Sequence, residues 1–233
     1  MIPPMRSIFK KFSKISDRKI SEIIKLFALD LPASKISEIT WISTNTAEYR
    51  SNYFREVISY YQELEKNEVL KWTMEIDESY FWATRVRWKR WRWAWWKIKV
   101  FGLLKRNWKI YTEIVDNVSA KTLLPIIRSK IDVESDVNTD GRTSYDGLVD
   151  LGFEKHHRVI HSQNEFARWK QHINWIESFR SYAKRRLAKF NWVPKHKFEL
   201  YLKECEFRFN CWLQNIDIYK QLRKLVKKFN LLG

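Results

Sequence analysis

Three carboxylates in this chain are placed where they could act together. Asp77 lies inside TMEIDESYF, an alternating run that predicts a β-strand, and Asp140 ends a second strand-like run, SDVNTD. Glu177 follows in a segment with helical periodicity. A charge inside a strand is costly unless it binds something. Carboxylates that converge on the central strands of a sheet suit Mg²⁺, which prefers hard oxygen ligands.

The chemistry of such a site would be phosphoryl transfer. Two metal ions about 3.5–4 Å apart can activate an attacking oxygen and stabilise a leaving one. The alternative is that these acids are solvated charges or salt-bridge partners, which is the usual state of isolated acids. The placement of Asp77 and Asp140 on strands favours the metal site.

Two groups of cations could hold a phosphate backbone near these acids. Lys184 follows Glu177 by two helical turns and shares its face, and Arg185 extends this basic surface. The second group lies in RWKRWRWAWWKIKVFG, residues 87–102, and comprises Arg87, Lys89, Arg90, Arg92 and Lys97. Cations neutralise phosphates and indole faces stack on unpaired bases. This segment is therefore either a platform for single-stranded nucleic acid or a Trp-rich β-ribbon packed on its own core.

The N-terminal part of the chain predicts three helices. Ser16 can cap a helix that ends near Ala28, SKISEIT forms a short second helix, and Ser43 or Asn45 can cap a third through Leu64. A short helix, a tight turn and a longer helix form a helix-turn-helix pattern. The third helix would then enter the major groove of DNA and carry Arg50. The alternative is a plain three-helix bundle.

From residue 72 the hydrophobic period changes to that of strands. We expect strands at 73–81, 97–106, 109–116, 135–140 and 158–161, and helices at 120–131, 174–189 and 195–209. This order predicts an α/β fold with a mixed sheet flanked by helices and preceded by a small all-α domain. The tail from residue 218 is an amphipathic basic helix, for which packing or DNA contact is favoured over a membrane surface.

Charge and composition restrict the class of protein. The net charge of +17 over 233 residues indicates nucleic acid or an anionic membrane as partner. No run has the length of a membrane-spanning helix, and the N-terminus lacks the apolar core of a signal peptide. The two cysteines, Cys205 and Cys211, match no zinc pattern. We therefore expect a cytoplasmic protein associated with nucleic acid.

Six motifs in register carry a resemblance to a known family. The chain resembles bacterial insertion-sequence transposases of the DDE type, in the ISXO-like group with a ribonuclease-H-like core, over residues 70 to 211. The motifs are EIDESYF, VFGLLKR, NTDGRTSYDGL, HSQNEFA, HINWIESFRSYAKRRL and YLKECEFRFN. The resemblance implies a helix-turn-helix DNA-binding region at 1–68, a ribonuclease-H-like catalytic domain at 69–212 and a basic C-terminal helix at 213–233.

The resemblance also assigns roles to residues already singled out. Asp77 and Asp140 match the first and second catalytic acids, and Glu177 matches the third, although some relatives use the position of Asn174. Lys184 matches a basic residue that grips DNA near the cut. The implied activity is metal-dependent hydrolysis at transposon ends followed by strand transfer, with two Mg²⁺ ions that Mn²⁺ can replace. The implied partners are double-stranded DNA and further copies of the chain, in a nucleoid-associated bacterial protein.

The chain departs from the family pattern at Arg180, where relatives usually carry an aromatic residue, and at many tryptophans. Gly occurs 5 times and Trp 13 times, whereas glycine is normally about 7% of residues. Turn or loop glycines are expected at Trp41, Trp72 and Trp192. The family has or tolerates Gly at Trp82, Trp88, Trp91, Trp93, Trp95, Trp96, Trp108, Trp169 and Trp175. One hypothesis is that UGA codons read as Gly have been translated as Trp.

Two other functions remain open from the sequence. The chain could be a catalytically inactive, transposase-derived DNA-binding protein. It could also be a single-stranded nucleic-acid binder that uses the Trp and Arg residues of 87–102. Cleavage of a DNA end with Mg²⁺ or Mn²⁺ separates the first from a transposase. Strong binding to single strands, lost when Trp91, Trp93 and Trp95 become Gly, would support the second.

Overall fold

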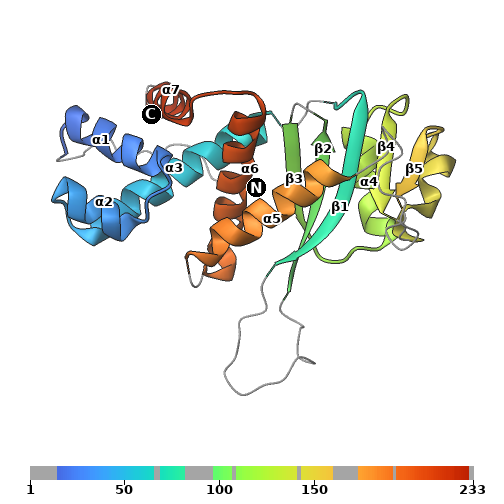
Figure 1. The fold of residues 1–233 in the computed structure, drawn as a ribbon, viewed down its shortest axis with the longest axis horizontal. Helices are drawn as coiled ribbons and strands as arrows, with labels where there is room; N and C mark the ends of the chain where they lie inside the picture. The colour runs from blue at the N-terminus through green and yellow to red at the C-terminus, as the bar shows by residue number, and fades with distance from the viewer. Residues whose placement is uncertain are drawn as a thin grey trace, which may run out of the picture. The chain divides into compact units, whose positions relative to one another are not determined.

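The computed structural model describes residues 15–65, 69–81, 97–106, 109–140, 143–159, 173–190 and 193–230. The chain forms two compact units, Met1–Lys66 together with Lys195–Gly233, and Asn67–Pro194. The first unit is helical and the second contains the sheet (Figure 1). Among the described residues, no helix is both long and apolar enough to cross a lipid bilayer.

The helical unit begins with the three helices expected from the sequence. They are α1 (Asp17–Ala28), α2 (Ala33–Thr40) and α3 (Thr44–Leu64). The hydroxyl of Ser16 accepts from the backbone N–H of Lys19, and that of Ser43 accepts from Thr46, so serine caps α1 and α3 as predicted. The C-terminal part adds the short 3₁₀ helix η5 (Lys195–Lys197), α6 (Phe198–Leu213) and α7 (Ile218–Asn230).

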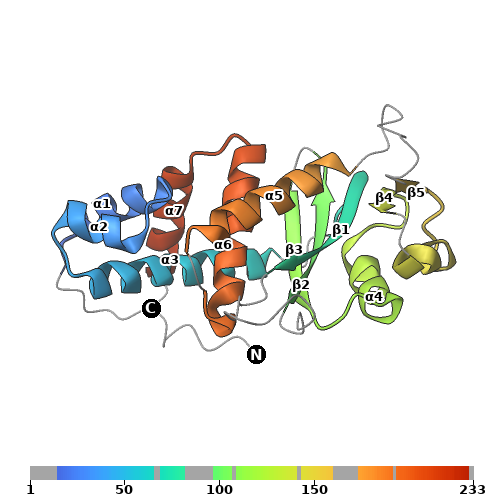
Figure 2. The same cartoon turned by 60° about the horizontal axis from the view of Figure 1, so that its bottom comes forward.

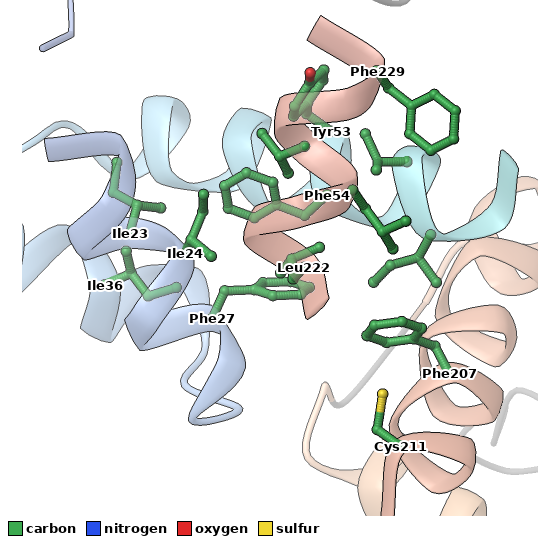
Figure 3. Packing of buried hydrophobic residues seen from close by; sticks show 14 of the residues in the cluster. Ile23, Ile24, Phe27, Ile36, Tyr53, Phe54, Phe207, Cys211, Leu222 and Phe229 are labelled. Atoms are coloured by element: carbon green, nitrogen blue, oxygen red, sulfur yellow. The ribbon is translucent and has the colours of Figure 1, made fainter. Parts of the chain in front are cut away.

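One apolar core joins these helices across the chain. Phe27 of α1 packs edge-to-face on Phe54 of α3, with ring centroids 5.3 Å apart. Phe207 of α6 and Leu222 of α7 are buried in the same cluster (Figure 3). The N-terminal and C-terminal segments are therefore parts of one hydrophobic core.

Buried charge pairs explain why α6 belongs to the helical unit. Glu204 of α6 accepts from Nε of Arg55 at 2.8 Å and from Nε of Arg208 at 2.9 Å. Glu206 likewise accepts from the side-chain amide of Gln62 on α3 at 2.8 Å. The compact units therefore differ from the ranges 69–212 and 213–233 expected from the sequence, because the polar and apolar partners of α6 lie on α1, α3 and α7.

The second unit is built on a five-stranded mixed sheet within the described residues. Its strands are β1 (Thr73–Phe81), β2 (Ile98–Lys105), β3 (Lys109–Val115), β4 (Asp136–Asp140) and β5 (His156–Val159), in the order β3-β2-β1-β4-β5. β2 is antiparallel to β1 and β3, and β4 is parallel to β1 and β5. A mixed sheet in an α/β unit is the fold class that the sequence predicted.

Helices cover both faces of this sheet. α4 (Ala120–Lys130) packs on one face, where its Leu123 and Ile127 contact a core with Ile76 of β1. α5 (Asn174–Ala188) crosses the opposite face over β1 and β2, as Figures 1 and 2 show. Because side chains alternate along a strand, Asp77 faces α5 while Ile76 faces α4. The arrangement brings the first acid and the helix of the third acid to one side of the sheet.

Two details of this unit differ from the expectation. β5 begins at His156 rather than Arg158, and Ile160 and His161 lie outside the described residues. A 3₁₀ helix, η3 (Thr143–Leu151), follows β4 and buries Tyr145 and Leu148, although its sequence lacks a clear helical period.

Two tryptophans adopt positive φ angles. Trp41 ends α2 in the left-handed conformation with φ 55° and ψ 37°, and Trp72 precedes β1 with φ 89°. The other non-glycine residues with positive φ among the described residues are Asp30 and Asn215. Aspartate and asparagine enter this region far more readily than bulky residues do.

Candidate active site

The sheet register brings Asp77 and Asp140 together. β1 and β4 run parallel with Ile76 opposite Thr139, so the next residue on each strand is an aspartate. Together with Glu78, each offers a carboxylate oxygen, and these oxygens lie within 4.8 Å of one another. Three acidic oxygens at this spacing can share one divalent cation.

Asp77 is buried, and the charges around it shift its pKa in opposite directions. Its residue exposure is 4%, and its Oδ2 accepts from Nη1 of Arg180 at 3.0 Å. Burial raises the pKa of Asp77 to about 6, while the Arg180 guanidinium opposes the rise and the charge of Asp140 adds to it. A nearby cation would stabilise the charged form of this carboxyl group, because it would compensate for the hydration that is lost on burial.

Glu177 lies in the first turn of α5, on the side of the sheet that carries Asp77. Its charge is among the causes that raise the pKa of Asp77, which places the two groups within electrostatic range. Its carboxylate is not part of the 4.8 Å group formed by the two aspartates and Glu78. Asn174, the alternative third ligand, is the exposed first residue of the same helix. The choice between Glu177 and Asn174 therefore stays a prediction.

Glu78 and Tyr145 are neighbours of the site that the sequence did not reveal. Both are buried, Glu78 next to Asp77 on β1 and Tyr145 on η3. Burial raises the pKa of the Tyr145 phenol well above its usual value, and the carboxylate of Glu78 adds to this. The sequence marked Glu78 only by its position next to Asp77 in the motif DES. It did not mark Tyr145, because the position of η3 depends on tertiary packing.

Cations gather on the α5 side of the site. Nζ of Lys184 lies 5.8 Å from the ring centroid of Phe81, at the end of β1. Burial lowers the pKa of Lys184, the charges of Arg180 and Lys97 lower it further, and Asp77 partly compensates. Lys184, Lys97 and Arg180 thus share one electrostatic neighbourhood with Asp77.

The remaining predicted DNA contacts are dispersed or outside the described residues. Arg185 is exposed on α5. Arg50 lies on α3 in the helical unit, with its guanidinium 5.7 Å from the ring centroid of Tyr49. The cations of the 82–96 segment, Arg87, Lys89, Arg90 and Arg92, lie outside the described residues.

The donor set fits a divalent metal ion. It consists of carboxylate oxygens, which hard cations prefer. Burial is the main cause of the raised pKa of Asp77, and the negative charges of Asp140 and Glu177 add to it. Asp77 and Asp140 are the residues that would hold such an ion, with Glu78 or Glu177 completing the set.

The sequence that spans the sheet unit and most of α6 identifies the family of the chain. Residues 69–210 match the family described as ISXO2-like transposase domain. The chain belongs to this transposase family. It is also 49% identical over 122 residues to an uncharacterized transposase-like protein of Haemophilus influenzae, a match covering 51% of this chain and 94% of that protein. The DDE group expected from the motifs is therefore confirmed.

Solved structures of Mos1 transposase show a more distant likeness. The Mos1 strand transfer complex is 11% identical with a TM-score of 0.36, covering 95% of this chain and 81% of that one. A pre-cleavage Mos1 transpososome is 10% identical with a TM-score of 0.35, covering 95% and 82%. These likenesses are too weak to add to the family assignment, which rests on the sequence.

Proposed function

We propose that this protein is a DNA transposase that cuts insertion-sequence ends and joins the freed 3′-hydroxyl to target DNA. The observation that carries the proposal is the pairing of Asp77 and Asp140 at adjacent strand positions in a transposase-family domain. Both reactions displace one oxygen at phosphorus by another, so one site can perform both in turn.

The acids of the site would hold divalent metal, Mg²⁺ by proposal and Mn²⁺ in its place. Metal bound there would activate the attacking oxygen and stabilise the leaving one. Asp77 and Asp140 fix the position of the site because they sit on central strands, and Glu177 approaches from α5. The number of ions, two by analogy with the family, belongs to the proposal.

Arg180, Lys184 and Lys97 would supply positive charge around the scissile phosphate. Arg180 already contacts Asp77, and the other two cations lie close enough to influence each other's charge. Preorganised cations stabilise the charge that develops on phosphate oxygens in the transition state. In this proposal, the protein side chains position the scissile phosphate and neutralise its charge, and none of them forms a covalent intermediate.

Recognition of the DNA ends is assigned by proposal to the helical region 1–68. The short α2, the turn at Trp41–Ser43 and the longer α3 form a helix-turn-helix pattern, and Arg50 lies on α3. A net charge of +17 supports binding to a phosphate backbone. Transposition joins two ends, so we include in the proposal a homo-oligomer assembled on double-stranded DNA in the bacterial nucleoid.

The test is a cleavage assay on a duplex that carries the terminal repeat of the element, with Mg²⁺ or Mn²⁺. Asp77→Asn should abolish cleavage by removing a metal ligand while leaving binding to the duplex unchanged. Asp136→Asn, on the same strand as Asp140, is the matched control and should retain both activities. Cleavage that survives Asp77→Asn would refute the assigned site.

A second candidate is a transposase-derived protein that binds DNA without cutting it. The observation in its favour is Arg180, which occupies a position that is usually aromatic in relatives and pairs with Asp77. In this case the wild-type protein would bind the duplex but cut nothing with either metal, and Arg180→Trp would restore cutting. The single-strand binder rests on residues 87–96, which lie outside the described residues.

A further inference from the structure

Glu75 is a fully buried carboxylate for which the sequence suggested no role. It lies on β1 two positions before Asp77 and has an exposure of 0%. The two side chains therefore point to the same face of the sheet, the face crossed by α5. A carboxylate this deeply buried is costly unless its oxygens are satisfied by donors.

The donors come from Arg106, which directly follows β2, and from the start of α5. Oε1 of Glu75 accepts from Nε of Arg106 at 3.1 Å. Oε2 accepts from the backbone N–H groups of Trp175 at 3.0 Å and Ile176 at 3.1 Å. These amides belong to the first turn of a helix, where N–H groups have no partner within the helix.

This contact replaces an ordinary helix cap. Ile173 occupies the N-cap position of α5 and its side chain makes no capping hydrogen bond. Glu75 supplies the cap from the sheet, and a negative charge is favourable at a helix N-terminus. Glu177 is the residue after Ile176, so the cap fixes the turn of helix that carries it.

A second contact fixes the depth of this turn. A Cβ atom on Gly102, the β2 partner of Asp77, would lie 3.1 Å from Cδ1 of Ile176. The helix therefore rests almost on the backbone of β2, directly beside Asp77. The hydrogen bonds to Glu75 fix the position of the turn along the sheet. The absence of a side chain at Gly102 lets the turn approach β2 closely.

We propose that Glu75 is a positioning residue that docks the first turn of α5 on the sheet and thereby holds Glu177 beside Asp77 and Asp140. This inference rests on the proposed function, because it concerns the third acid of that site. The backbone donor at position 175 does not depend on the side chain there. Arg106 serves as the second anchor of the same carboxylate.

The test measures Mn²⁺ affinity by calorimetry in the whole protein. Glu75→Gln should raise the Kd for Mn²⁺ by about 10- to 100-fold, as expected for residues that orient metal ligands. In a Glu177→Gln background the same change should add little, because the group being positioned is already lost. Glu113→Gln on β3 is the matched control and should leave the Kd unchanged.

Amide exchange at residues 175 and 176 gives an independent reading of the docking and should accelerate in Glu75→Gln. Glu75→Asp keeps the charge with a shorter reach, and should show an intermediate Kd if Glu75→Gln fails to fold. An unchanged Kd, or an equal loss with and without Glu177, would overturn the inference. If the wild type binds no Mn²⁺, the proposed function fails and the exchange rates alone decide the docking.

An independent observation concerns the two tryptophans with positive φ. Trp41 and Trp72 are 92% and 75% exposed, so no packing of the indole holds either backbone in place. Glycine enters this region without steric cost, and a left-handed glycine is the common residue at a helix C-terminus such as that of α2. The φ of 89° at Trp72 resembles that of Gly152, at 93°.

Composition points in the same direction. The thirteen Trp and five Gly residues together number eighteen, close to the ~16 glycines that an average usage of about 7% gives for this length. We infer that positions 41 and 72 are glycine in the native protein and that their codons are UGA, read as Gly in the source lineage and as Trp in this sequence.

The codons of the gene and the mass of the native protein test this inference directly. TGA at positions 41 and 72, with glycine in the corresponding native peptides, is the expected result. TGG at both positions would overturn it. In the recombinant protein, Trp41→Gly and Trp72→Gly should each raise Tm by about 2–4 °C, because strain is relieved.

Trp212→Gly is the matched control for the thermal measurement. Trp212 is also exposed but lies within α6, where glycine weakens a helix, so its replacement should lower Tm. If Trp41→Gly and Trp72→Gly lower Tm as Trp212→Gly does, these positions do not favour glycine.

Discussion

Asp77 is subject to two opposing influences that together define the site. Burial disfavours its charge, and the guanidinium of Arg180 favours it. Because burial is the larger cause, the carboxylate remains under-compensated in the protein without metal. A site of this kind lowers the stability of the metal-free protein and favours the binding of a cation.

This imbalance predicts a pH-dependent effect of Asp77→Asn on stability. The pKa of Asp77 is raised from 3.8 to about 6, so the folded state binds more protons between these values. The metal-free wild type should therefore lose more stability than Asp77→Asn as pH rises from about 4 to about 6. Above pH 7 the variant should be more stable by up to ~3 kcal/mol, a figure that already includes the opposing effect of Arg180.

Urea unfolding with a chelator present, at pH 4.5 and pH 7.5, measures this difference. Asp136→Asn on β4 is the control and should follow the wild type. A stability difference between Asp77→Asn and the wild type that is the same at both pH values would contradict the environment assigned to Asp77.

The sequence singled out two acids of the proposed site but not their partners. Asp77 and Asp140 stand out because a charge within or at the end of an apolar strand is unusual, and because the motifs around them resemble those of the family. Arg180 contacts Asp77 across 103 sequence positions, and Glu75 caps α5 across 100. Such contacts depend on the register of a helix on a sheet, which periodicity does not specify.

At the scale of elements, the placement of α5 on the sheet governs the site. Gly102 provides the space, since its added Cβ would meet Ile176 at 3.1 Å and the carbonyl oxygen of Asp77 at 3.6 Å. The end of the Ile176 side chain can move slightly, so alanine should be tolerated. A branched residue should instead lift the first turn of α5.

We therefore predict graded effects at Gly102. Gly102→Ala should retain most cleavage activity, and Gly102→Val should lose about 100-fold because a displacement near 1 Å can cost this much. The measurement is the cleavage rate with Mg²⁺, accompanied by Tm and duplex binding to show that the fold is intact. Wild-type cleavage by a folded Gly102→Val protein would mean that the depth of α5 does not control the site.

Most elements followed from the sequence because their patterns are local. The strand TMEIDESYF has the bounds of β1, and serine caps marked the starts of α1 and α3. The 3₁₀ helix η3 was missed because it lacks an amphipathic period and depends on the packing of Tyr145. Long-range pairs such as Arg55 with Glu204 join α6 to the helical unit, and a local sequence pattern does not specify such pairs.

At the scale of the whole molecule, excess positive charge is the dominant property. The chain carries 44 basic and 27 acidic residues, and three of the acids, Glu75, Asp77 and Glu204, are buried and form ion pairs. Exposed cations are therefore available on both units, including Arg185 on α5 and the basic face of α7. DNA that contacts these cations would release condensed counterions.

Binding of the protein to duplex DNA should weaken as the salt concentration rises. The logarithm of the association constant should fall linearly with the logarithm of salt concentration, with a slope of about −0.9 for each phosphate neutralised. Replacing Lys97, Lys184 and Arg185 by Gln should reduce the slope by up to about 3, if these residues line the DNA path at the site. Fluorescence anisotropy between 50 and 300 mM NaCl gives the slope, and replacing the exposed Lys121 and Arg128 of α4 by Gln is the control for the loss of positive charge elsewhere. An unchanged slope in the triple variant would mean that the DNA does not contact these residues. The slope reports the number of phosphates that the protein neutralises and does not depend on the base sequence of the duplex.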